Sequence, residues 1–307
     1  MNRSDAPVVP LPVRNPRASV IERANYVPDL LPRKGAARPV EALAPPPVVL
    51  LLHDGRNGDV LDLVESGLAT GIEDSHLIAR HRFAPDMTAG AFTRFLERHR
   101  PACVVLVPPL SGSDDLAALC ARAQVRCLRL GVTGDLACDE RRAAAVAVAR
   151  LVAAGHARIG LVSGAEGSPS AQQRELGYLD AMAEYGLDRG PALIVPGDDT
   201  FESGIEAGLL LLEISPRPTA ILACNDAMAL GLLHAAARAG IAVPDALAVV
   251  GFDDTPLARR ALPALSSVHV PWERIGQEAA RRVLSDAQAP PVSFEGELVE
   301  RASSHFG

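Results

Sequence analysis

The sequence lacks the features that mark membrane proteins, exported proteins and proteins held together by disulfides or zinc. No apolar run approaches the ~20 residues needed to span a bilayer, and residues 1–16 contain no continuous apolar core of a signal peptide. The five cysteines form no C-x-x-C pair and are odd in number, which argues against a disulfide framework and a structural zinc site. These absences predict a cytoplasmic protein with reduced, mostly buried thiols.

Acidic residues outnumber basic residues outside the first 47 residues. Those residues hold seven basic and four acidic side chains, whereas the remainder of the chain holds 23 basic and 33 acidic ones. Affinity for phosphates comes mainly from neutralisation by Lys and Arg. The body of the protein therefore has no general positive field for nucleic acid, and any such contact must use the N-terminal segment.

Signatures of the common enzyme classes are also missing. No G-x-G-x-x-G follows the first apolar strand, and the chain has no P-loop, no G-x-S-x-G elbow and no H-E-x-x-H motif. The eight histidines are scattered without a second ligand at metal spacing. The sequence thus predicts no catalytic residue, no metal and no cofactor, and an enzyme is the least favoured hypothesis.

Short apolar runs alternate with helical stretches from Val48 onward. The runs are continuous rather than alternating, so their strands are expected to be buried on both faces, with right-handed βαβ crossovers between them. The pattern predicts an α/β fold with parallel sheets. Strands are expected at 48–52, 103–107, 127–130, 159–163, 192–195, 220–224, 247–251 and 297–300, and helices at 59–70, 88–99, 114–123, 140–154, 171–185, 203–213, 227–239 and 272–285.

The chain is expected to divide into a tail and two lobes. Residues 1–47 contain ten prolines, which predicts a mostly extended segment with at most one short helix. The spacing of strands and helices restarts around 131–139, which favours two similar lobes joined by three crossovers. The first lobe is predicted at 48–133 plus 271–290, and the second at 134–270 plus 291–307.

Polar side chains follow several of the predicted strands. Asp54, Asn225 and Asp253 come directly after apolar runs, and Arg174 lies in the turn and helix after another. Ligands of open parallel sheets bind beyond the carboxyl ends of the strands. Carboxylates, an amide and a guanidinium without a nucleophile and base suit ligand binding rather than turnover. The neighbouring Asp226 and Asp254 can instead cap a helix or brace a turn.

Several motifs, in order along the chain, resemble the LacI/GalR family of bacterial transcriptional regulators. They are HARIGLVSG (156–164), TAILACNDAMALG (219–231), GIAVPDALAVVGFDD (240–254), LPALSSVHVP (262–271) and LVERASS (298–304). The resemblance covers about residues 48–304. It implies a type I periplasmic-binding-protein-like fold with two lobes, a small effector in the cleft between them and a homodimer, without a membrane partner.

The resemblance also assigns candidate effector-binding residues. Arg174 sits where the family arginine grips the effector, and Asn225 and Asp253 match the residues that bind ligand hydroxyls or amines. Ser168 and Ser170 fall on the matching loop. Two departures argue against a plain sugar: Asp199 stands where an aromatic is expected, with Phe201 two residues further on, and Val270 stands where some sugar-binding members carry glutamine.

The segment ERANYVPDLLPRK (22–34) resembles the end of the family's DNA-binding headpiece, with Tyr26, Pro28 and Arg33 in the hinge remnant. A complete headpiece needs roughly 45 residues before Tyr26, whereas 25 precede it here. Pro32 also removes a backbone donor where the hinge helix would run. We therefore predict weak or no sequence-specific DNA binding by this polypeptide, and operator DNA as a partner only if a complete headpiece lies upstream of Met1.

The leading hypothesis is a transcriptional regulator whose core senses a sugar-like or related polar metabolite and responds by lobe closure. The alternative is a solute-binding protein of a transport system, which shares the fold but requires export.

Overall fold

In the computed structural model, residues 45–132, 134–285 and 289–304 are described. The chain divides into two units, Met1–Ala44 and Pro45–Gly307. Tyr26, Pro28 and Arg33, which the sequence assigns to a hinge remnant, lie outside the described residues. Their roles remain predictions, and the fold described below is that of the second unit.

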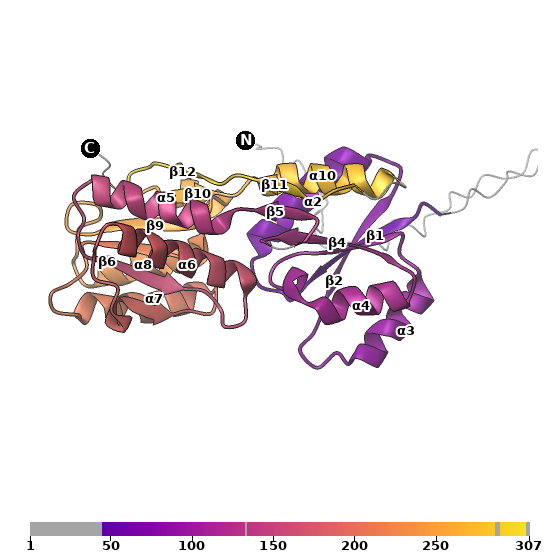
Figure 1. The fold of residues 1–307 in the computed structure, drawn as a ribbon, viewed down its shortest axis with the longest axis horizontal. Coiled ribbons are helices and arrows are strands. Elements are labelled where there is room, and N and C mark those ends of the chain that lie inside the picture. Colours follow the sequence, from indigo (N-terminus) through magenta and orange to yellow (C-terminus); the bar gives the residue numbers. More distant parts are fainter. Residues whose placement is uncertain (1–44, 133, 286–288, 305–307) are drawn as a thin grey trace, which may run out of the picture. The chain divides into compact units, whose positions relative to one another are not determined.

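The first lobe is built on a six-stranded sheet. Its described pairings are all parallel, which places the carboxyl ends of its strands at one edge. The strands lie in the order β11 (Val292–Phe294), β5 (Leu136–Cys138), β4 (Arg126–Gly131), β3 (Cys103–Leu106), β1 (Val48–His53) and β2 (Leu77–Arg82) (Figure 1).

The second lobe contains another six-stranded sheet, in which β12 runs antiparallel to β10 and the other pairings are parallel. Its strands lie in the order β12 (Glu297–Val299), β10 (Ser266–His269), β9 (Ala248–Asp253), β8 (Ala220–Ala223), β6 (Ile159–Ser163) and β7 (Ile194–Pro196). Every residue of β6, β8 and β9 is buried, as expected for strands covered on both faces. The predicted two-lobed α/β fold is confirmed.

Helices pack on the sheets in pairs. In the first lobe they are α2 (Gly58–Ile72), α3 (Ala89–His99), α4 (Asp114–Arg122) and α10 (Trp272–Leu284), with the 3-10 turn η1 (Leu110–Gly112). In the second they are α5 (Glu140–Ala153), α6 (Pro169–Glu184), α7 (Phe201–Glu213), α8 (Asp226–Arg238) and α9 (Pro256–Arg260), with η2 (Pro191–Leu193). The pairs with extensive contacts are α2 with α10, α5 with α6, and α7 with α8.

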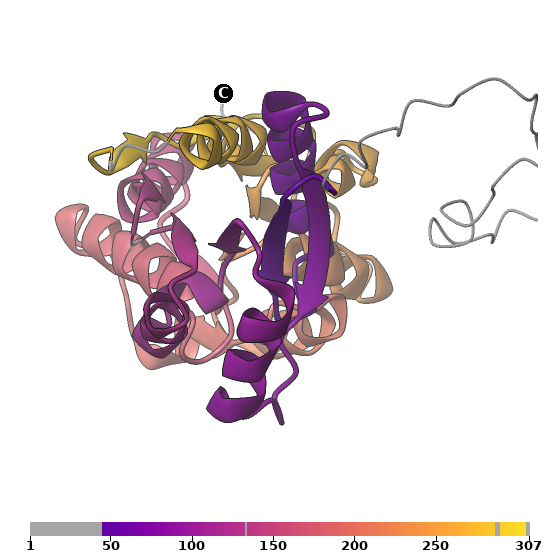
Figure 2. The same ribbon diagram turned by 90° about the vertical axis from the view of Figure 1, so that its right-hand side faces the viewer.

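The contact between α2 and α10 is close enough to require glycine. These helices lie side by side although about 200 residues separate them in sequence (Figure 2). A Cβ at Gly67 would lie 2.0 Å from the backbone oxygen of Glu273, and a Cβ at Gly276 would lie 2.3 Å from that of Val64. The absence of side chains at these two positions therefore sets how the returning helix α10 docks on the first lobe.

Capping side chains fix where several helices begin. The hydroxyl of Ser168 accepts from Ala171 N at the start of α6, and the amide oxygen of Asn225 accepts from Met228 N at the start of α8. Asp139 caps α5 in the same way through Arg142 N. Such caps satisfy backbone N–H groups that have no partner inside the helix.

Four strands were missed by the sequence analysis, and each departs from the apolar-run pattern. One of them, β10, has the sequence SSVH, in which valine is the only aliphatic residue. The strand β2 has the sequence LIARHR and lies at a sheet edge, where most of its side chains are partly or fully exposed. The strands β5 and β11 have only three residues each. Edge and very short strands carry little hydrophobic signal, because only part of their surface is buried.

Two lobe boundaries lie a few residues later than the sequence predicts. We expected the second lobe to begin at 134 and to resume at 291, but β5 and β11 pair with each other in the first sheet. The chain therefore crosses between the lobes after Cys138, between β10 and α10, and after Phe294. The difference arises because the loop-forming residues around 131–135 precede a short strand rather than the crossover itself.

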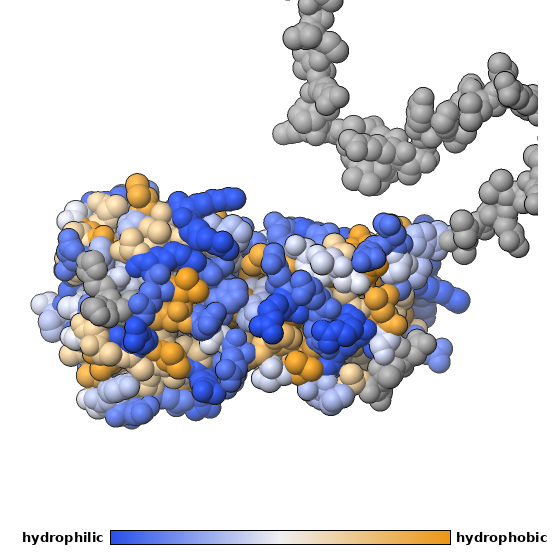
Figure 3. Space-filling view, turned by 90° about the horizontal axis from the view of Figure 1, so that it is seen from above, coloured by the Kyte–Doolittle hydropathy of each residue, from blue (hydrophilic) through white to orange (hydrophobic). Residues whose placement is uncertain are grey.

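The face that carries α5 and α10 mixes hydrophilic and hydrophobic residues (Figure 3). Helix α10 buries Trp272, Ile275 and Ala279 and exposes Glu273, Arg274 and Arg281, as an amphipathic helix on a protein surface does, although Arg282 is buried. Among the described residues, no helix combines the length and apolar character needed to cross a bilayer.

Candidate functional site

A buried arginine and two buried carboxylates form the centre of the candidate site. Arg174 Nε lies 2.6 Å from Glu140 Oε2, and Arg174 Nη2 lies 2.8 Å from Asp253 Oδ1. The guanidinium also donates to the backbone oxygen of Cys224, and its Cζ lies 4.0 Å from the ring centroid of Phe252. One cation is thus enclosed by two anions, a carbonyl oxygen and an aromatic face, with little access to water.

Burial and the neighbouring charges shift the pKa values of this cluster in opposing directions. Burial disfavours the charged form of Arg174, but Asp253 and Glu140 outweigh it and raise the pKa of the guanidinium, which stays protonated. Burial raises the pKa of Glu140 despite the attraction of Arg174, and Asp253 raises it further. With two carboxylates for one guanidinium, the cluster carries a net negative charge when both acids are ionised.

Asp253 links this cluster to the other lobe. It is the last residue of β9 in the second lobe, and its backbone has a φ of 97°. The indole Nε1 of Trp272 donates to Asp253 Oδ1 at 3.2 Å. Trp272 is the first residue of α10, which packs on the first lobe. The carboxylate is therefore held from both lobes at once.

Asn225 forms a second link. Besides capping α8, it donates through Nδ2 to Asn57 Oδ1 at 3.3 Å and to the backbone oxygen of Asp199 at 2.9 Å. Asn57 precedes α2 in the first lobe and adopts a left-handed backbone conformation, with a φ of 52°. Two amide side chains thus meet across the cleft at the ends of β8 and β1.

Small cavities lie between these groups. One of about 20 Å³ is lined by residues that include Asn57, Arg174, Asn225, Asp253 and Trp272. A second of about 100 Å³ shares Asn57, Asn225 and Asp253 and adds Asp59 and Asp226. The first has room for about one water molecule. The cleft between the lobes is therefore nearly filled by its own side chains.

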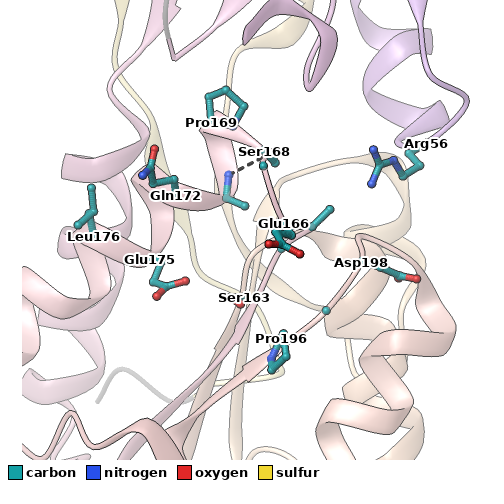
Figure 4. Close-up of a pocket in the computed structure, with 15 residues that line it drawn as sticks. Arg56, Ser163, Glu166, Ser168, Pro169, Gln172, Glu175, Leu176, Pro196 and Asp198 are labelled. Carbon is teal, nitrogen blue, oxygen red and sulfur yellow. Dashed lines mark hydrogen bonds between the residues drawn. The ribbon is translucent and has the colours of Figure 1, made fainter. Parts of the chain in front are cut away.

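A larger groove of about 920 Å³ adjoins this cleft and shares Ser168 and Ala171 with the smaller cavity. Figure 4 shows Arg56 reaching from the first lobe over the groove, whose other walls come from the segments that follow β6 and β7. Asp198 lies on that opposite wall, and its pKa is lowered mainly by hydrogen bonds from Thr200 and Ser203, with a smaller contribution from Arg56.

The two predicted serines lie beside the cluster with unequal access to a ligand. Ser168 caps α6 and lines both the small cavity and the groove. Ser170 lies within the cluster, where its hydroxyl donates to Glu140 Oε1 at 3.4 Å. The structure therefore brings Ser168, Ser170, Arg174, Asn225 and Asp253 together, as the sequence predicts for an effector site, and their contact with a ligand remains a proposal.

Asp54, Phe201 and Val270 are not part of this lining. Asp54 binds Arg56, accepting from Arg56 N at 2.9 Å and from Arg56 Nε at 2.6 Å. Phe201 is 37% exposed at the start of α7, where its ring lies edge-on to His234 at 5.9 Å. Val270 is buried in the core. Asp54 can act on the site only through Arg56, which lines the groove.

The two aspartates for which the sequence left a structural role open do brace the fold. Asp226 Oδ1 accepts from Ser267 Oγ at 2.6 Å, and its Oδ2 accepts from Thr255 N at 2.7 Å. Burial raises the pKa of Asp226 to about 7, against an opposing effect of these hydrogen bonds. Asp254 pairs with Arg301 Nη2 at 2.6 Å, which ties the last part of the described chain to β9.

Sequence reasoning missed Glu140, Asn57 and Trp272. An acidic residue in the first turn of a helix is common, because it complements the helix dipole, so nothing in the sequence distinguishes Glu140. Asn57 belongs to a loop without a motif. Trp272 could have been noticed, because it is the only tryptophan and directly follows the motif that ends at 271. Among the described residues, no group of three His, Cys, Asp or Glu side chains is placed to hold a metal ion.

Comparison with known proteins gives a consistent result. A family model described as a periplasmic binding protein-like domain matches residues 148–304, about half of the chain. The transcriptional regulator AscG of Escherichia coli (strain K12) is 37% identical over 182 residues, which are 58% of this chain and 54% of that protein. The transcriptional repressor CytR of the same organism is 37% identical over 162 residues, or 53% of this chain and 48% of that protein.

A solved structure extends the similarity over most of the described chain. The complex of the transcriptional regulator CelR with cellobiose has a TM-score of 0.74 and 26% identity, and it covers 85% of this chain and 86% of that one. The chain spans about half the length of the curated relatives it matches.

The two lobes, the three crossovers and the polar groups that meet between the lobes define a two-lobed ligand-binding core. The chain belongs to the periplasmic binding protein-like family, and the relatives AscG, CytR and CelR that it resembles are transcriptional regulators. The resemblance stated from the sequence motifs is thereby confirmed.

Proposed function

We propose that this chain is the effector-binding core of a transcriptional regulator that binds a small polar metabolite between its lobes. The observation that carries the proposal is the meeting of Asn225 and Asp253 from the second lobe with Asn57 and Trp272 from the first. A ligand that contacts these groups touches both lobes, so its binding energy depends on how the lobes are arranged. That dependence is what couples binding to regulation.

Entry of a ligand into the space around Asn225 and Asp253 requires the lobes to part. Small-molecule sites typically have volumes of about 300–1,000 Å³, whereas the two cavities in the cleft measure about 20 and 100 Å³. The Asn57–Asn225 and Trp272–Asp253 hydrogen bonds must then break in the open arrangement and be replaced or remade around the ligand. The core thus has two states that differ by a few hydrogen bonds, and an effector shifts the balance between them.

The partners follow from the same proposal. We place the protein in the cytoplasm as a homodimer, because its relatives AscG and CytR are transcriptional regulators. Operator DNA is a partner only where a complete headpiece precedes Tyr26. A solute-binding protein of a transport system is not favoured, since the matched relatives are regulators. The same relatives favour a binding protein over an enzyme.

The test uses the single tryptophan. Trp272 is buried at the cleft, so its fluorescence should change when a ligand enters or the lobes move. We expect at least one compound in a library of sugars, nucleosides and sugar acids, with cellobiose included, to change the emission saturably. The Asp253→Ala variant should bind that compound about 1.5–3 kcal/mol more weakly, as for the loss of a charge-assisted hydrogen bond. Unchanged affinity in this variant would show that the compound does not bind in the cleft at Asp253.

Regulation itself is tested in the source organism. Deleting the gene should change transcription of a small set of genes, and the identified effector should produce a similar change in the intact strain. Transcription that responds to neither would overturn the regulatory proposal while leaving ligand binding in place.

A further inference from the structure

The donors of Arg174 are almost fully used by the protein itself. A guanidinium has five N–H groups, and Arg174 makes four hydrogen bonds, to Glu140, to the backbone of Cys224 and twice to Asp253. Only one N–H can remain for a ligand. The fork that binds a carboxylate through two parallel hydrogen bonds is therefore not available in this arrangement.

Glu140 holds the Nε edge of the guanidinium, which is one of the two edges through which an arginine can bind a carboxylate. Asp253 takes the end formed by Nη1 and Nη2, and Glu140 takes Nε at 2.6 Å. Glu140 is 1% exposed, and its other oxygen accepts from Ser170. It comes from the first turn of α5, immediately after a crossover between the lobes. The Glu140 carboxylate is thus held by Arg174 through one oxygen and by Ser170 through the other.

The charges around Arg174 also disfavour an anionic ligand. Among the described residues that line the two cleft cavities, Arg174 is the only Lys or Arg, whereas Asp59, Asp199, Asp226 and Asp253 each contribute a carboxyl group. Burial raises the pKa of Asp199 and of Asp59, and the nearby carboxylates Asp253 and Asp62 respectively raise them further. An anionic ligand would meet repulsion here and find no free cation to offset it.

We propose that Glu140 is a built-in counter-anion that determines the charge class of the effector. This inference rests on the proposed function. The cleft then binds uncharged or amine-bearing polyhydroxyl ligands, whose N–H and O–H groups donate to its carboxylates. It rejects ligands that carry a carboxylate or a phosphate. Arg174 then acts as a positioning residue that orients Asp253 rather than as the group that grips the ligand.

Chemical rescue by acetate tests the occupancy without knowledge of the effector. In Glu140→Ala, the vacated edge of Arg174 should bind acetate, so sodium acetate should raise the Tm by a few degrees relative to the same concentration of sodium chloride. The wild type and the control Glu184→Ala, which removes an exposed carboxylate from α6, should show no such rise. A rise of equal size in the wild type, or none in Glu140→Ala, would overturn the proposal.

A matched set of ligands tests the charge class. Glucose, glucosamine and glucuronate share a ring and differ in the charge of one substituent. We expect the wild type to bind glucose or glucosamine at least tenfold more tightly than glucuronate, and Glu140→Gln, which keeps the side-chain shape, to reduce that ratio at least tenfold. Tighter binding of glucuronate by the wild type would overturn the inference and leave the proposed function standing.

The two proposals fail in different ways. If neither these sugars nor any other library compound binds the wild type while acetate still rescues Glu140→Ala, then Arg174 is occupied as inferred and the proposed effector function is what fails. If Glu140→Ala does not fold, Glu140→Gln carries the test through the matched ligands, and an unchanged ratio of glucose to glucuronate affinity in this variant would overturn the inference.

Discussion

The indole Nε1 of Trp272 lies 3.2 Å from Asp253 Oδ1, and this hydrogen bond joins the first turn of α10 to the end of β9. The two residues belong to different lobes, and the segment between them contains the crossover from β10 to α10. The bond therefore forms only when the lobes are close. It connects the arrangement of the lobes directly to the carboxylate that we place in the effector site.

We expect Trp272→Phe to favour the open arrangement. Phenylalanine keeps most of the ring packing but cannot donate, so the closed state should lose about 0.5–1.5 kcal/mol. Small-angle X-ray scattering without ligand should then give a larger radius of gyration than the wild type. Tyr178→Phe is the matched control, because it removes a 2.8 Å hydrogen bond to the Ile159 carbonyl within one lobe. An equal increase in both variants would refute the role of the indole as a link.

Arg174→Met should destabilise the protein by about 3–5 kcal/mol, because it leaves Glu140 and Asp253 buried without their cation. Neutralising one acid should recover part of this loss. Urea unfolding of Arg174→Met, Glu140→Gln and the double variant gives the coupling energy between the two positions. If the effects of the two single changes simply add, the pair does not form the ionic unit described here.

At Asn225, a pair of variants separates helix capping from the contact between the lobes. Asn225→Ala loses both the cap of α8 and the bond to Asn57, and it should cost about 1 kcal/mol in unfolding free energy or more. Asn225→Ser restores a capping oxygen but cannot reach Asn57. We expect the serine variant to regain stability yet still to bind the effector weakly. Full recovery of affinity with serine would limit Asn225 to its capping role.

The stability contributed by Asp226 should fall as the pH rises. Its pKa in the folded protein is raised to about 7 from the ordinary value of 3.8, mainly by burial. The folded state therefore binds the proton more tightly, and the stabilisation is complete below the ordinary value and lost as the pH passes through about 7. Each pKa unit corresponds to about 1.4 kcal/mol.

Asp226→Asn removes this dependence, so its unfolding free energy relative to the wild type should improve between pH 4 and about pH 8. Urea unfolding at several pH values measures the difference, and the subtraction cancels the contribution of the other titrating groups. A difference that does not vary with pH would show that the carboxyl of Asp226 titrates alike in the folded and unfolded chains.

Gly67→Ala tests the close packing of α2 on α10. The new methyl group would lie 2.0 Å from the backbone oxygen of Glu273, and the helices must separate to relieve the overlap. We expect a loss of about 1–3 kcal/mol or more, as for overpacking of a core. Gly58→Ala in the same helix has nothing within 4 Å of the added carbon and serves as the control. Equal unfolding midpoints for the two variants would show that the helices are not held at this distance.

Much of this fold could be predicted from the sequence. Buried parallel strands such as β6 and β8 have continuous apolar runs, and the helices between them begin at capping residues that are recognisable in the sequence, such as Ser168. The strands β2 and β5 could not be found in that way, because one lies at an edge with exposed side chains and the other has three residues. Their place in the sheet depends on pairing with distant neighbours.

The candidate site was predictable where its residues follow strands. Asn225 and Asp253 end or follow β8 and β9, so sheet topology alone brings them together. Glu140 could not be predicted, because it reaches Arg174 only through the packing of α5 on α6. The same packing places the guanidinium of Arg174, which the sequence predicts to contact a ligand, against the protein's own acids.

The way in which β11 and β12 complete the two sheets has a consequence for synthesis. Residues 292–294 pair with β5 in the first sheet, and residues 297–299 pair with β10 in the second. A ribosome must therefore translate nearly the whole described chain before either lobe has all its strands. Until then, β5 and β10 expose unpaired edges, which are the surfaces on which chains aggregate. The nascent chain should thus need chaperones most late in translation. That need should end for both lobes almost together, because the codons for β11 and β12 lie only a few positions apart.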